Sequence, residues 1–212
     1  MTPTSEGEAL TLVLHALRLR SVAEDQALAA RFSLPQPQVR AMLDRAEREG
    51  WARRRTGRLV GWTLTATGRM EGEARLAAAL DQSGVRPQVE SLYERFLVLN
   101  PEVLEVSTAW QVRRRNGVDV PNDHADARHD AAVIDALAAV HDRAVPVVES
   151  LSAHVARLGG YGSRLEAALA RVMAGDGDWF VRPGIDSYHT VWFELHEDLL
   201  ATLGRRRADE AP

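Results

Sequence analysis

Glutamine and arginine side chains gather between residues 36 and 58 in a pattern suited to contact with nucleic acid. Both side chains can form paired hydrogen bonds with base edges in the major groove of DNA, and arginine also binds phosphates. Asp44 argues against this chemistry, because it places a carboxylate near the same surface. The alternative is an arginine-rich surface that contacts only solvent. The candidate DNA-contacting residues are Gln36, Gln38, Arg40, Arg45, Arg48, Arg53, Arg54, Arg55 and Arg58.

Aromatic and histidine side chains form a second group, in the C-terminal half of the chain. Apolar walls with a few convergent polar groups are typical of small-molecule sites between helices. The candidate effector pocket consists of Trp110, Gln111, His141, Tyr188, His189, Trp192 and His196. The alternative is that the tryptophans belong to the core and that the histidines, His141 above all, are buried residues without a ligand.

Histidines of this second group are also candidate metal ligands. His189 and His196 lie seven residues apart, so a helix separates their backbones by about 10 Å. One zinc ion needs its ligand atoms within roughly 3–4 Å of each other. The pair alone therefore makes no metal site, and we expect neither a metal nor another cofactor. A site that combines one of the two with His124, Asp126 or His129 stays open.

Motifs of catalysis are missing from the sequence. It has no cysteine, so thiol nucleophiles, thiolate metal sites and disulfides are excluded. It also has no phosphate-binding glycine loop, no nucleophile motif and no HExxH pair. Glu197 and Asp198 are neighbours on a predicted helix, so their carboxylates point in different directions. We expect no enzymatic activity.

The N-terminal elements follow from periodicity and caps. Leu10, Val13, Leu14 and Leu17 repeat at helical spacing and predict a helix over residues 6–20. The segment 21–24 is typical of a capping box that starts a second, short helix. A third helix begins at the prolines 35 and 37, buries Val39, Leu43 and Ala46, and ends before residue 50. The pattern then predicts strands over 51–55 and 58–63 around a turn at 56–57, and a helix over 66–81.

These elements resemble the winged helix-turn-helix of MarR-type bacterial regulators. The resemblance covers about residues 6–80. It rests on residues 34–54 as recognition helix and wing, on Gly57, and on Leu64-Thr65 with Gly68 as the exit from the wing. It implies that residues 1–82 form a winged helix-turn-helix with a small β-hairpin wing. Together with the helical periodicity of the rest of the chain, this predicts a mainly α protein in which an all-α helical bundle, residues 83–212, follows the winged helix. The resemblance also implies a regulator of transcription that binds operator DNA.

The C-terminal half has helical periodicity almost throughout. One helix over 89–99 is followed by another that begins at Asn100-Pro101, and residues 117–128 form a loop whose Asp126 caps the next helix. An apolar seam that stays in phase through Pro146 predicts a single long helix over 127–158, kinked at the proline. Further helices are expected over 163–174 and 186–203.

Parts of this half resemble, more weakly, a helical region of actinobacterial MarR-family regulators and of proteins associated with phosphoenolpyruvate-utilising domains. The resemblance rests on residues 96–100, 110–111 and 186–196, and no biochemical role comes with it. It leaves an alternative open, in which the winged helix docks onto a metabolic enzyme rather than onto DNA.

Charge separates the two halves. Every basic residue is an arginine, and residues 1–80 carry 12 arginines against 9 acidic side chains, whereas residues 81–212 carry 14 against 21. The net charges are therefore +3 and −7.

With no apolar stretch of membrane-spanning length and no signal peptide, we expect a cytoplasmic protein without membrane contact. The expected partners are double-stranded operator DNA, a second copy in a homodimer, and a small-molecule effector.

Overall fold

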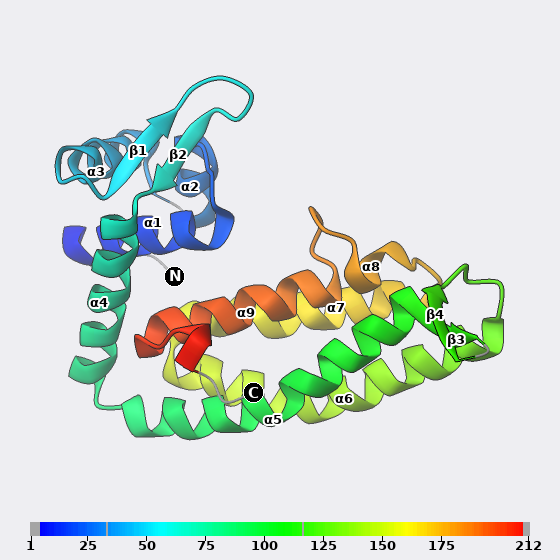
Figure 1. Cartoon of the computed structure of the whole chain (residues 1–212). Coiled ribbons are helices and arrows are strands. Elements are labelled where there is room, and N and C mark those ends of the chain that lie inside the picture. The colour runs from blue at the N-terminus through cyan, green and yellow to red at the C-terminus, as the bar shows by residue number, and fades with distance from the viewer. Residues whose placement is uncertain (1–4, 33, 116, 210–212) are drawn as a thin grey trace. The chain divides into compact units, whose positions relative to one another are not determined.

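The computed structural model describes residues 5–32, 34–115 and 117–209. The protein is mainly helical and divides into two compact units (Figure 1). The first unit comprises Met1–Arg86 together with Glu197–Pro212, and the second comprises Pro87–His196. None of the described helices combines the length and the apolar composition that a membrane span requires.

Four helices and a hairpin form the N-terminal part of the first unit. The elements are α1 (Glu6–Arg20), α2 (Asp25–Phe32), α3 (Gln36–Arg48), β1 (Ala52–Arg55), β2 (Gly61–Leu64) and α4 (Ala66–Ser83). The predicted apolar face of α1 is confirmed, because Leu10, Val13, Leu14 and Leu17 are all buried. The predicted inward face of α3 is confirmed in the same way. Both helices pack into one core with Trp62 of β2.

Two local predictions for this unit were wrong. Residues 21–24 form no capping box: Ser21 ends α1 with a positive φ of 60°, and Ala23 forms a two-way backbone bridge with Trp62. The chain reverses direction after α1, and the bridge between Ala23 and Trp62 adds a third short segment beside β2. The turn at 56–57 is also too short, because Arg55 pairs with Gly61 and residues 56–60 form the connection.

The start of α4 is built on a close backbone approach. Thr65 caps the helix, since its hydroxyl accepts a hydrogen bond from the Gly68 N–H at 2.9 Å and donates one to the Gly50 carbonyl. A β-carbon on Gly68 would lie 1.8 Å from the Trp51 carbonyl oxygen. The wing exit predicted at Leu64-Thr65 and Gly68 thus coincides with a position where only glycine fits.

The last part of α9 (Tyr188–Leu203) completes the first unit. His15 of α1 and Asp198 of α9 are both buried, with 3.1 Å between Nε2 and Oδ2. Arg18 donates hydrogen bonds to Glu73 and to the Glu197 carbonyl. A short 3-10 helix, η2 (Arg207–Asp209), follows α9.

The second unit consists mostly of long helices. Its elements are α5 (Arg86–Gln111), which starts at the boundary, β3 (Val112–Arg115), β4 (Val118–Pro121), α6 (Ala127–His154), η1 (Ala156–Gly160), α7 (Tyr161–Met173), α8 (Asp178–Val181) and the first part of α9. The long helix through Pro146 is confirmed, although it ends at His154. Asp126 caps it as predicted, accepting hydrogen bonds from the N–H groups of Arg128 and His129.

Two further predictions for this half were wrong. Asn100-Pro101 starts no helix, because Pro101 lies inside the continuous α5. The Asn100 side chain instead accepts a hydrogen bond from Trp192 Nε1 at 3.0 Å. The bundle is also not all-α, since β3 and β4 form an antiparallel hairpin in which Arg115 pairs with Val118.

Candidate functional site

The predicted DNA-contacting residues lie on α3 and on the hairpin of β1 and β2. Gln36 and Gln38, in the first turn of α3, are exposed. Arg48 at the end of α3 is exposed as well. All three arginines of β1, Arg53, Arg54 and Arg55, are exposed, as is Arg58 in the connection to β2. The tip of this hairpin also exposes two apolar side chains, those of Leu59 and Val60.

Two arginines of the predicted set have partners within the protein. Arg40 forms ion pairs with Asp25 at 2.9 Å and with Asp44 at 3.3 Å, and its guanidinium lies over the Trp62 ring. Arg45 lies 3.6 Å from Glu6, a largely exposed carboxylate. The carboxylate of Asp44 was the feature of the sequence that argued against DNA contact. In the structure this carboxylate forms an ion pair with Arg40.

The remaining predicted arginines have no ion pair with any residue that the structure describes. They are Arg48, Arg53, Arg54, Arg55 and Arg58. We call this group the free arginine cluster. Its five charges are not neutralised by carboxylates of the described residues, so they are available to a polyanion.

The predicted effector residues separate into two places. His141, Tyr188, Trp192 and His196 lie buried among the helices of the second unit. Tyr188 contacts His141, with 3.3 Å between its hydroxyl and Nδ1, and stacks with Trp192. Burial lowers the pKa of His141, partly offset by Asp142 and Glu166, and burial raises the pKa of Tyr188. Half-buried His189 also has a lowered pKa, because of burial.

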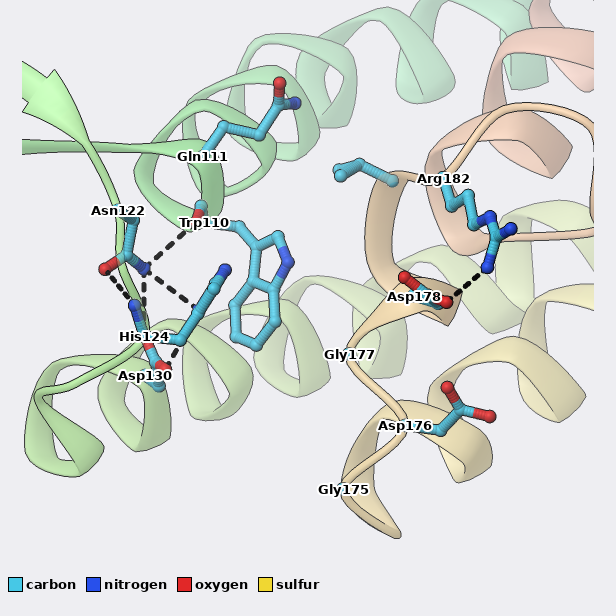
Figure 2. A pocket seen from close by; sticks show the side chains of 11 residues that line it. Trp110, Gln111, Asn122, His124, Asp130, Gly175, Asp176, Gly177, Asp178 and Arg182 are labelled. Atoms are coloured by element: carbon cyan, nitrogen blue, oxygen red, sulfur yellow. Dashed lines mark hydrogen bonds and ion pairs between the residues drawn. The ribbon is translucent and has the colours of Figure 1, made fainter.

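Trp110 and Gln111, the other two members, line a pocket of about 720 Å³ (Figure 2). The five residues named above are not among those that line it. Its walls come from the end of α5, from the segment between β4 and α6, and from the segment that runs into α8. The lining residues are Trp110, Gln111, Asn122, His124, Asp130, Gly175, Asp176, Gly177, Asp178, Val181 and Arg182.

Trp110 is held in place by aromatic and glycine contacts. Its ring stacks with Phe180 at 4.6 Å between centroids, and the His124 ring lies 4.5 Å away at an angle of 42°. A β-carbon on Gly177 would come within 2.9 Å of the indole. Glycine at position 177 therefore lets the α7–α8 segment approach the ring closely.

A network of polar contacts fixes His124 on the same side of the pocket as Trp110. His124 has a positive φ of 55°, and its Nδ1 lies 3.0 Å from Asp130 Oδ2. The Asn122 amide donates hydrogen bonds to Asp130 and to the Trp110 carbonyl. Burial raises the pKa of Asp130, but the hydrogen bonds from Asn122 and His124, with the charges of His124 and His129, outweigh it and lower the pKa.

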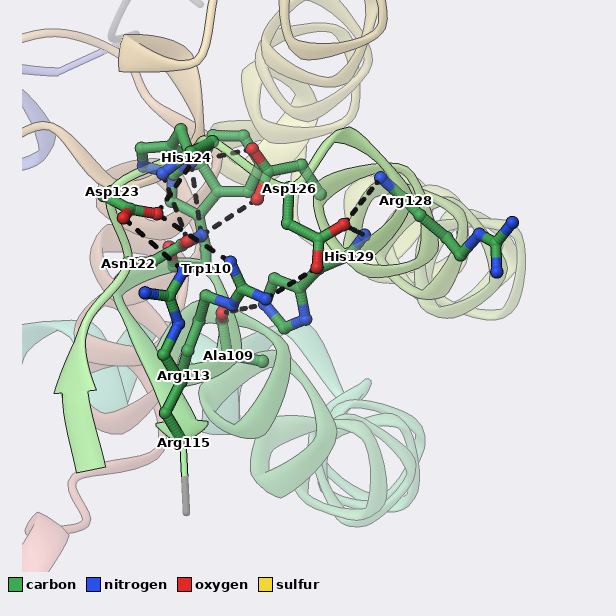
Figure 3. A network of polar contacts seen from close by, with 12 residues as sticks. Ala109, Trp110, Arg113, Arg115, Asn122, Asp123, His124, Asp126, Arg128 and His129 are labelled. Carbon is green, nitrogen blue, oxygen red and sulfur yellow. Dashed lines mark hydrogen bonds and ion pairs between the residues drawn. The ribbon is translucent and has the colours of Figure 1, made fainter. Parts of the chain in front are cut away.

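Arg113 ties the second hairpin to the start of α6 (Figure 3). Its guanidinium donates a hydrogen bond to Asp126 at 2.7 Å and lies 3.8 Å from Asp123. Hydrogen bonds from the His129 and Arg128 N–H groups, among other contacts, lower the pKa of Asp126. The helix cap and the hairpin therefore share one carboxylate.

The metal site left open by the sequence has no support in the described part of the chain. Among these residues, no group of three or more histidine, aspartate or glutamate side chains has an arrangement that could hold a metal ion.

Comparisons with known proteins assign no family. No protein-family model matches the sequence, and no curated protein or solved structure shows a significant match. The resemblance to MarR-type regulators therefore stays a prediction. A function can be proposed only from the residues of this chain.

Proposed function

We propose that the protein is a DNA-binding transcriptional regulator whose first unit acts as a winged helix-turn-helix. In this proposal α3 is the recognition helix and the hairpin of β1 and β2 is the wing. The observation that carries it is the free arginine cluster, since unneutralised arginines on a protruding hairpin suit phosphate or minor-groove contact.

The α3 residues have different roles in this proposal. Gln36 and Gln38 are exposed in the first turn, the part of a recognition helix that contacts base edges. Arg40 is held by Asp25 and Asp44, so it supports the packing of α3 against α2 and contributes less to binding. Arg45, with a single exposed partner, remains available for a phosphate contact.

Two-fold symmetry follows from the same proposal. One recognition helix reads a half-site, so a regulator of this type binds as a homodimer to a palindromic operator. The second unit then serves dimerisation, ligand sensing or both. A crystal of the protein with DNA would place the two copies of α3 about 34 Å apart, one turn of the duplex.

The test compares two triple variants with the same change in charge. Arg53→Ala/Arg54→Ala/Arg55→Ala removes part of the cluster. Arg95→Ala/Arg114→Ala/Arg128→Ala removes three exposed arginines of the second unit that also have no ion pair with a described residue. Affinity for a fluorescent duplex, selected from a random-sequence pool with the wild-type protein, is measured by anisotropy at several salt concentrations.

We expect wild-type binding to weaken steeply with salt. Loss of three phosphate contacts lowers the slope of log K against log salt by roughly 2–3 for the cluster variant. The control variant keeps the wild-type slope. Equal slopes for the two variants, or folded wild-type protein that enriches no duplex at low salt, contradict the proposal.

A further inference from the structure

The pocket beside Trp110 presents a hydrogen-bond donor that the protein leaves unused. Trp110 is 8% exposed, and its indole N–H has no hydrogen-bond partner among the described residues. Figure 2 shows the indole nitrogen on the ring edge that faces Asp178 and Arg182 across the pocket. Phe180 and His124 lie against the ring, so a ligand meets this edge. Covering the N–H without an acceptor costs free energy, so a ligand here needs an acceptor atom.

The charges around the pocket favour a positive ligand. Its lining includes three carboxylates, those of Asp130, Asp176 and Asp178, against the single guanidinium of Arg182. Asp176 has a distant, exposed partner outside the lining, Arg171 at 3.9 Å. Asp130 is engaged by Asn122 and His124. Asp178 pairs with Arg182 on the rim, where both side chains are more than half exposed. The Asp178 carboxylate can therefore accept a further hydrogen bond from a bound cation.

The two sides of the pocket are held in different ways. Asn122 and Asp130 fix His124, and packing fixes Trp110. The side formed by Asp178 and Arg182 is exposed and can adjust to a ligand. A fixed donor facing an adjustable carboxylate is suited to a small molecule with an acceptor and a cation close together.

We propose that this pocket binds an organic ammonium compound that also carries a hydrogen-bond-accepting oxygen. The oxygen accepts from Trp110 Nε1–H, the ammonium group donates to the Asp178 carboxylate, and apolar parts of the ligand contact Val181. All lining residues belong to the second unit, so binding does not depend on DNA contact by the first unit.

The test follows the indole N–H signals of ¹⁵N-labelled protein by NMR. The chain has five tryptophans, and Trp110→Phe identifies the Trp110 signal by its loss. L-Phenylalaninamide, with both groups, is titrated at a pH where its amine is charged. Phenethylamine lacks the carbonyl oxygen, and N-acetyl-L-phenylalaninamide lacks the charge.

Phenylalaninamide is expected to shift the Trp110 signal with saturation in the millimolar range. Each analogue should bind about fivefold more weakly or worse, the factor expected for one lost hydrogen bond. Asp178→Asn, a rim variant with little effect on folding, should weaken phenylalaninamide binding by a similar factor. Asp135→Asn, an exposed carboxylate that does not line this pocket, should leave it unchanged.

Three results would overturn the proposal. The Trp110 signal does not move on addition of phenylalaninamide, the uncharged analogue binds as tightly, or Asp178→Asn and Asp135→Asn have equal effects. DNA binding by the same samples is measured separately, so failure at the pocket is distinguishable from failure of the proposed function.

Discussion

His15 of α1 and Asp198 of α9 form a buried polar pair in the first unit. Their side chains are 3% and 2% exposed, and the Thr202 hydroxyl donates a second hydrogen bond to Asp198 at 3.3 Å. A carboxylate enclosed to this degree depends on its polar neighbours, because water does not replace them. The pair therefore matters less for its own attraction than for what remains when one partner is removed.

We predict that His15→Leu lowers the free energy of unfolding by about 3 kcal/mol or more, because it removes a polar partner of a buried carboxylate. The double variant His15→Leu/Asp198→Leu should recover part of this loss, since no buried carboxyl group is left without this partner. Denaturant unfolding measures both. His154→Leu, at an exposed histidine, is the control and should change stability by less than about 0.5 kcal/mol. Equal losses for His15→Leu and His154→Leu would contradict the argument.

At the scale of elements, the junction of the hairpin with α4 depends on Gly68. The Trp51 carbonyl lies where a β-carbon at position 68 would be, and it also accepts a hydrogen bond from the Thr65 N–H at 2.9 Å. The end of α3, the hairpin and the first turn of α4 therefore meet at one backbone contact.

Gly68→Ala is predicted to destabilise the first unit by about 3 kcal/mol or more, because the methyl group displaces α4 from Trp51. Gly162→Ala is the matched control. Gly162 lies in the first turn of α7, and a β-carbon there would meet only Val148 of α6, at 3.9 Å. Alanine favours a helix over glycine, so this change should be neutral or stabilising. Thermal unfolding of the two variants, followed by circular dichroism, checks the prediction. A Gly68→Ala protein as stable as Gly162→Ala would refute it.

Helices with a clear apolar period were predictable from sequence, because burial of one face leaves a regular pattern. The faces of α1 and α3 and the course of α6 through Pro146 are examples. The prediction of a helix start at Asn100-Pro101 was wrong, because Pro101 lies inside α5. A proline that suits a first turn can also lie inside a helix, where packing of the surrounding side chains compensates for the missing hydrogen bond.

The sequence contains a signal for the second hairpin. Asn116-Gly117 lies between the stretches 112–115 and 118–121, which both contain valine, and this dipeptide is a strong indicator of a two-residue hairpin turn. Gly117 has a φ of 80°, and residue 116 is outside the described residues.

The pocket itself was not predictable beyond Trp110 and Gln111. Asp178 and Arg182 come from a segment more than sixty residues further along the chain, and periodicity does not show which segments meet.

At the scale of the whole molecule, the first unit is discontinuous in sequence. Charge and periodicity suggest a boundary near residue 82, but Glu197–Pro212 groups with Met1–Arg86. Arg86 donates a hydrogen bond to the Leu203 carbonyl, and a β-carbon on Gly204 would contact Ala77. The buried residues Leu199 and Leu200 lie in the same returning segment.

We predict that a fragment of residues 1–86 alone is unstable, because it lacks the apolar surface and the Asp198 partner of the returning segment. A synthetic peptide of residues 197–209 should restore cooperative thermal unfolding to the fragment. A peptide with Asp198→Ala should do so less well. A fragment that unfolds at the wild-type temperature without any peptide would contradict this prediction.

The return of α9 to the first unit also has a consequence for synthesis on the ribosome. The α1–α4 segment leaves the exit tunnel early, but the residues that cover its core are translated after the whole of the second unit. The nascent chain therefore carries an incomplete first unit until the residues after 196 have been translated.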